Sequence, residues 1–141
     1  MSYISTNIVI KCIRKKYFRT FLMIFINMEI EINDNLFNVK PLLTSKDTQR
    51  GMMFKKFNGD FDGMLFFMER GPQSFWMKNC LVSLDMIFID NGVIHNIQHH
   101  CKPCKTEDCP GYEGYGDMVL ELPGGTCEKY DIKKGDEVKF S

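Results

Sequence analysis

The chain contains no long hydrophobic run. Its longest apolar stretch is residues 21–26, far short of the ~20 residues that a membrane-spanning helix needs. There is no internal repeat, low-complexity tract or coiled-coil heptad, and there is only one tryptophan. We also find no nucleophile elbow, phosphate-binding loop or zinc-protease helix motif. These absences exclude solenoid and fibrous proteins and the commonest enzyme signatures, and 141 residues are typical of one globular domain.

Charge is distributed unevenly, although the net charge is zero. Residues 1–28 carry five basic and no acidic side chains, whereas residues 29–141 carry 13 basic and 18 acidic ones. We therefore predict two units: a basic segment, 1–28, outside the fold, and one β-rich domain, 29–141. An acidic domain without a basic stripe argues against nucleic-acid binding, because binding to phosphates depends on positive charge.

The basic segment has three open interpretations. Basic residues within 11–19, followed by the apolar residues 21–26, resemble a degenerate export signal or a weak surface anchor. A disordered basic arm is the second interpretation. The third is upstream sequence read from a start codon placed too early, with Met28 as the true start. The protein is expected to be cytoplasmic if the segment is not a signal.

Strand and turn signals dominate from Met28 onward. Apolar residues alternate with acidic ones over 29–32, and Asn33-Asp34-Asn35 predicts a hairpin turn before 37–39. Thr44 to Asp47 resembles a capping box that opens a short helix near 44–51, which Gly51 would end.

The second half of the chain continues this pattern. The apolar run 64–68 predicts a strand that Gly71-Pro72 breaks before a separate strand at Trp76. Asp90-Asn91-Gly92 predicts a second hairpin, and residues 118–122 another strand. The predicted fold is mainly β, an antiparallel β-sandwich or distorted, partly closed barrel with one short helix near 44–51.

The tryptophan lies in the block Phe75-Trp76-Met77-Lys78-Asn79. Strand alternation places Phe75, Met77 and Asn79 on one face and Trp76 and Lys78 on the other. An aromatic platform beside a cation suits a small polar ligand. The same pattern also fits a tryptophan at the edge of the core beside a solvated lysine.

Acid–base residues are present without a recognisable catalytic arrangement. Asp85, within an apolar strand, has three readings: pairing with Lys78, acting as a base with a raised pKa, or capping a turn. The complete set of candidates is Lys78, Asp85, Asp90, His95, Glu121 and Asp136.

Three of the six cysteines lie close together, just after three histidines. A tetrahedral zinc site would use Cys101, Cys104, Cys109 and a histidine, for which we take His99. Free thiols are an alternative. Cys12, Cys80 and Cys127 are scattered, and we interpret them as buried or incidental.

Seven motifs follow one another in the order and spacing of a known family: Arg50–Phe54, Gly63–Phe66, Phe75–Asn79, Leu84–Asp90, Cys109–Tyr112, Val119–Gly125 and Gly135–Asp136. Over about 29–140 the chain resembles domain-of-unknown-function family 192, small β-rich proteins of bacteria, archaea and phages. The resemblance implies a compact sandwich-like fold, often an exported or periplasmic location, and a Cys104–Cys109 disulfide, but no reaction. Cys80 and Ser83 depart from the usual Thr and Pro.

From these observations we predict a binding module. Trp76, Lys78, Asn79 and Asp85 would hold a small polar ligand, a saccharide or a peptide, without a cofactor. One alternative is a hydrolase or other enzyme at the same cluster. Another is a structural or virion-associated accessory protein without a pocket.

Overall fold

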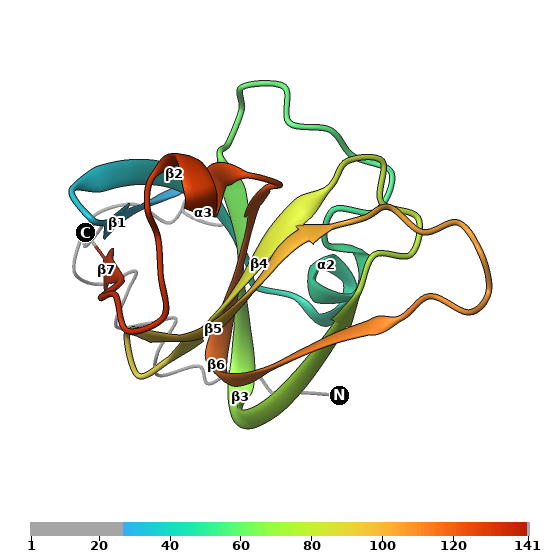
Figure 1. Ribbon diagram of the computed structural model, residues 1–141. Coiled ribbons are helices and arrows are strands. Elements are labelled where there is room, and N and C mark those ends of the chain that lie inside the picture. The colour runs from blue at the N-terminus through green and yellow to red at the C-terminus, as the bar shows by residue number, and fades with distance from the viewer. Residues whose placement is uncertain (1–26, 141) are drawn as a thin grey trace.

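The computed structural model describes residues 27–140. This part of the chain forms seven strands and two short helices (Figure 1). The elements are β1 (Met28–Ile32), β2 (Asn35–Leu42), α2 (Ser45–Arg50), β3 (Gly63–Trp76), β4 (Leu84–Asp90), β5 (Val93–Cys101), β6 (Gly111–Pro123), α3 (Thr126–Lys129) and β7 (Lys139–Phe140).

All seven strands belong to one sheet, in the order β5-β4-β6-β3-β2-β1-β7. The sheet curls strongly into half a barrel (Figure 1), which confirms the predicted mainly β, partly closed form. One pairing departs from the antiparallel expectation, because β2 and β3 run parallel. Parallel neighbours need a crossover connection, and residues 43–62, which include α2, provide it.

Local turn chemistry behaves as predicted at the first hairpin and at α2. Asn33 and Asp34 both have positive φ, as a tight hairpin turn requires. The hydroxyl of Thr44 accepts a hydrogen bond from the backbone N–H of Asp47, at 3.1 Å, and caps α2. Gly51, with a φ of 46°, ends the helix. The four-residue helix α3 was not predicted, since so short a segment has no helical period.

The predicted break at Gly71-Pro72 is wrong. Strand β3 runs from Gly63 through to Trp76, and its pairing with β6 shifts register between Phe67 and Gly71. An irregularity of this kind accommodates a proline without ending the strand. The apolar run and the tryptophan block are therefore two halves of one bent strand.

Both sides of the central strands are buried. On β4, Met86 and Phe88 belong to a core cluster on the side of α2, whereas Ile87 and Ile89 belong to a cluster shared with β1, β2 and α3. Burial on both faces explains why this strand is a continuous apolar run rather than an alternating one. The alternation also places two buried acids, Asp85 and Glu121, on opposite sides of the sheet.

Candidate functional site

A cavity of about 840 Å³ opens between α2 and the sheet, within the size range of small-molecule sites. We call it the Glu121 cavity, after the acid that lines it. Its other lining residues come from α2, the turn after α2, β3 and the segment after β3: Ser45, Lys46, Thr48, Gln49, Arg50, Gly51, Met52, Met53, Phe66, Met68, Ser74, Phe75, Trp76 and Cys80.

Glu121 is a buried acid, and it has no ion-pair partner among residues 27–140. It lies on β6 directly between Met64 of β3 and Met86 of β4, and its exposed fraction is 4%. Its Oε2 atom has no hydrogen-bond partner among the described residues. Burial in these apolar surroundings raises the pKa of Glu121 to about 8. The side chain is therefore mostly protonated at neutral pH and offers the cavity both a donor and an acceptor.

Gly51 brings the end of α2 close to this acid. A Cβ atom built on Gly51 would lie 3.0 Å from the Phe66 ring and 3.8 Å from the Glu121 Oε2. The Lys55 ammonium donates to the Gly51 carbonyl at 3.0 Å, and burial is the main cause that lowers the pKa of Lys55. Positive φ and close packing thus favour glycine at this position.

Aromatic rings and cations contribute to the lining of the cavity. Phe66 and Phe75 pack edge to face, with their centroids 4.9 Å apart. Trp76 is 47% exposed, and the Lys78 ammonium lies 5.3 Å from the Trp76 ring centroid. Lys46 and Arg50 add two further cations, and neither has an ion-pair partner within residues 27–140.

The thiol in the cavity, Cys80, is not poised as a nucleophile. Burial, with a smaller contribution from the nearby Glu121, raises the pKa of Cys80 to about 12. Because the thiolate is the reactive form, this thiol is inert at neutral pH. It is buried, as interpreted from the sequence.

The structure divides the predicted ligand cluster. Trp76 and Lys78 lie together, and Lys78 also pairs with Glu107 at 3.3 Å. Asn79, whose φ is 59°, acts through its backbone, which bonds Phe54 and Cys104.

Asp85 lies on the other side of the sheet, within the environment of α3. Its carboxylate accepts backbone N–H bonds from His100, Gly125 and Cys127 at 2.9–3.2 Å. These contacts fit the interpretation of Asp85 as the cap of a turn. They do not fit its pairing with Lys78, which among the described residues pairs with Glu107.

The remaining acid–base candidates do not join the cavity. Asp90 pairs with Arg70 at 2.8 Å, and this ion pair holds the pKa of Asp90 below its usual value. Asp136 accepts from the side chain of Asn33 and the backbone of Lys133 in a turn. The exposed His95 ring lies against Tyr115, 5.3 Å between centroids.

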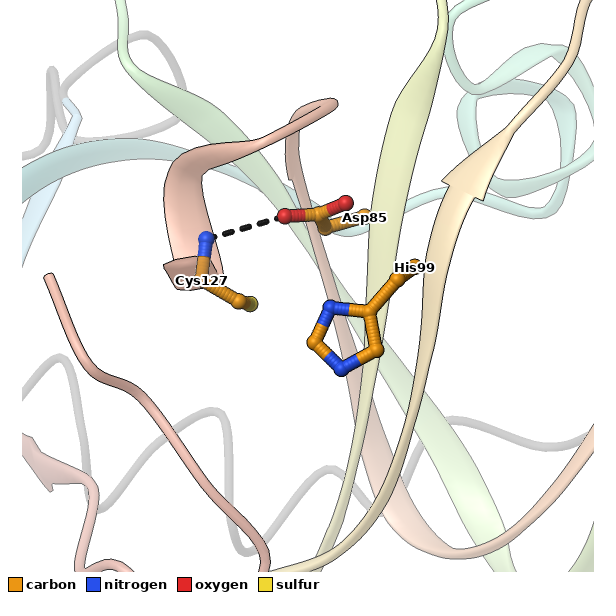
Figure 2. A group of neighbouring side chains, drawn as sticks. All are labelled: Asp85, His99 and Cys127. Atoms are coloured by element: carbon orange, nitrogen blue, oxygen red, sulfur yellow. Dashed lines mark hydrogen bonds between the residues drawn. The ribbon is translucent and has the colours of Figure 1, made fainter. Parts of the chain in front are cut away.

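Two side chains of types that can bind metals lie beside Asp85. The His99 imidazole of β5 and the Cys127 thiol of α3 lie close to its carboxylate, and one ligand atom from each residue lies within 4.8 Å of the others. Figure 2 shows the three side chains directed toward a common space. Burial raises the pKa of the Cys127 thiol above its ordinary value.

The other predicted metal set does not form. Cys104 and Cys109 are joined in a disulfide, so their sulfurs are not available as thiolate ligands. Cys101 is a buried free thiol, and Cys12 lies outside the described residues. The predicted Cys104–Cys109 pairing is thus the one that the structure contains.

Sequence reasoning named Glu121 only as one acid among several. The signal was present, because a carboxylate within the apolar strand 118–122 is unusual unless it is paired. Lys46 and Arg50 were missed, since only the crossover through α2 brings them beside β3.

The half-barrel defines a small β-rich domain whose fold is already seen in solved structures. The chain belongs to the DUF192 family, described as "Uncharacterized ACR", whose model matches residues 23–140. A protein of unknown function from Novosphingobium aromaticivorans DSM 12444 is 28% identical, with a TM-score of 0.71, covering 80% of this chain and 84% of that one.

A second solved structure is described as a "putative transcription regulator" from Sinorhizobium meliloti 1021. It is 25% identical, with a TM-score of 0.69, covering 81% of this chain and 93% of that one. No curated protein matches the chain. Among residues 27–140, no helix is both long and apolar enough to cross a membrane.

Proposed function

We propose that this protein is a binding module for a small molecule with an apolar body and a negatively charged end, held in the Glu121 cavity. The observation that carries this proposal is the unpartnered, buried Oε2 of Glu121. A buried polar atom without a partner costs about 1–3 kcal/mol. A ligand hydroxyl or carbonyl that reaches this carboxyl group would recover that cost.

The cavity walls and rim support the ligand class. Phe66 and Phe75 present apolar surface, and the half-exposed Trp76 offers a ring face for stacking. The exposed Lys46 and Arg50 supply positive charge that no acid within residues 27–140 pairs with, which favours an anionic group. Of the two predicted ligands, a short peptide with an apolar side chain and a carboxylate suits this lining better than a saccharide.

This proposal modifies the cluster predicted from the sequence. It retains Trp76, with Lys78 stacked beside it, and replaces Asp85 with Glu121. The proposed site leaves out Asp85, since its carboxylate accepts a bond from the Cys127 backbone of α3 and does not line the cavity.

An enzyme acting at the same cavity is the second candidate. A carboxyl group whose pKa is about 8 is suited to proton transfer near neutral pH. A covalent mechanism through Cys80 is disfavoured, because its thiol is protonated at that pH. An enzyme would turn over a ligand found by binding, whereas a binding module would release it unchanged.

Thermal-shift screening of the full chain tests the proposal, using short peptides, small carboxylates and saccharides. We expect an anionic, partly apolar compound to raise the melting temperature. Glu121→Met retains the side-chain volume but removes the hydrogen-bonding oxygens, so it should fold and lose most of that shift.

A matched pair of arginine variants tests the rim. Arg50→Gln should weaken ligand binding. Arg70→Gln, which removes an exposed arginine paired with Asp90, should leave ligand binding unchanged. An equal shift in wild type and Glu121→Met would place the ligand elsewhere. No shift with any compound would favour the accessory-protein alternative.

A further inference from the structure

The group of Asp85, His99 and Cys127 lies on the other side of the sheet from the Glu121 cavity. Asp85 comes from β4, His99 from β5 and Cys127 from α3 (Figure 2). β4 and β5 are the two strands of one hairpin, whereas α3 lies more than 20 residues further along the chain, so the tertiary fold brings the thiol to the carboxylate and the imidazole. Nothing in the proposed function uses them.

Two of the three groups are held rigidly. Asp85 is fully buried and is oriented by the backbone N–H groups of His100, Gly125 and Cys127. Cys127 is buried at 1% exposure. A carboxylate has about four acceptor positions, and four hydrogen bonds reach this one, because the Gly125 N–H is shared between its two oxygens. A ligand that binds Asp85 would therefore replace one of these bonds, and the shared Gly125 bonds, at 3.2 Å, are the longest of them. Hydrogen bonds of this kind also fix the direction of a ligating carboxylate.

His99 is the adjustable member. Its side chain is exposed, and neither ring nitrogen has a hydrogen-bond partner among residues 27–140. Ligands at metal distances of ~2.0–2.3 Å in a tetrahedron lie about 3.5 Å apart. The present separations, up to 4.8 Å, therefore need a closure of about 1 Å, which rotation of an exposed ring on β5 can supply.

We propose that Asp85, His99 and Cys127 form a binding site for a divalent transition metal, with zinc as the best match. One oxygen, one imidazole nitrogen and one sulfur are the donor types that zinc accepts, whereas magnesium and calcium prefer oxygen alone. Three protein ligands leave a fourth coordination position, and the exposure of His99 places that position toward solvent. The exposed Glu128, paired with His100 at 3.2 Å, adds negative charge nearby.

Cobalt titration of the metal-free full chain, with its disulfide intact, tests this site. Zinc and cobalt bind such ligands similarly, and cobalt bound to a thiolate gives a charge-transfer absorption in the near ultraviolet. We expect one cobalt ion per chain, displaced by zinc, with a proton released from the thiol as the metal binds.

Histidine variants provide the matched comparison. His99→Ala should weaken cobalt binding at least tenfold, whereas His95→Ala, which removes an exposed histidine of the same strand, should leave it unchanged. Cys127→Ser should abolish the charge-transfer absorption. If Cys127→Ser fails to fold, the cobalt affinities of His99→Ala and His95→Ala still test the site, because both histidines are exposed.

Three results would overturn the proposal. The first is the absence of a charge-transfer absorption in the wild type. The second is equal cobalt affinity in wild type and His99→Ala. The third is loss of the absorption in Cys12→Ser, which would assign the thiolate to the N-terminal segment instead.

Discussion

Replacing Glu121 with glutamine should make the protein more stable at neutral pH, and more so as pH rises. In the unfolded chain the carboxyl group titrates near 4.5, and in the folded protein near 8. Between these values the folded protein keeps a proton that the unfolded chain has lost. Folding then takes up a proton, so the stability of the wild type falls as pH increases.

The size of the effect follows from the pKa difference. Each pH unit within this window corresponds to ~1.36 kcal/mol. The wild type should therefore lose about 3 kcal/mol between pH 4.5 and 7, and about 4 kcal/mol by pH 8, relative to a neutral variant. Below pH 4.5 both states are protonated and the effect disappears.

Urea unfolding under non-reducing conditions, from pH 4.5 to 8.5, measures this difference. Other titrating groups are the same in the wild type and in Glu121→Gln. The difference between their free energies of unfolding therefore reports the titration of Glu121 alone. Glu121→Met should show the same pH dependence as Glu121→Gln, although the absolute stabilities differ, because only loss of the titrating group determines it. If the difference in free energy of unfolding between the wild type and Glu121→Gln does not change with pH, the reasoning is refuted. Glu121 would then be ionised in the folded protein.

Three further expectations concern other parts of the chain. Trp76→Ala should cost roughly half of the ~3–5 kcal/mol of a buried aromatic side chain, because Trp76 is 47% exposed; a full core penalty in urea unfolding would contradict this. If residues 1–27 lie outside the domain, a chain beginning at Met28 should melt within a few degrees of the full length, and a larger fall would move the boundary. Reductant should add two hydrogen masses to the intact protein and lower its stability by ~2 kcal/mol through loss of the Cys104–Cys109 bridge, and a variant with both cysteines replaced by serine should be indifferent to reductant.

Sequence reasoning succeeded where structure depends on neighbouring residues. Thr44 and Gly51 delimit α2 as their capping chemistry predicts. Asn91-Gly92 joins β4 to β5 in a hairpin, as expected of this dipeptide. The prediction failed at Gly71-Pro72, because pairing with β6 on both sides of the register shift outweighs the local tendency of these residues to end a strand.

The sequence by itself determined the mainly β composition, the local turns and caps, and the presence of a tryptophan beside a cation. Only the tertiary structure decided which acid serves the cavity. Asp85 of β4 pairs with Leu122, the neighbour of Glu121 on β6, and successive residues of a strand face opposite sides of the sheet. That one-residue difference in register places Glu121 beneath α2 and Asp85 beside α3. Long-range pairing sets the register, and no local pattern in the chain encodes it.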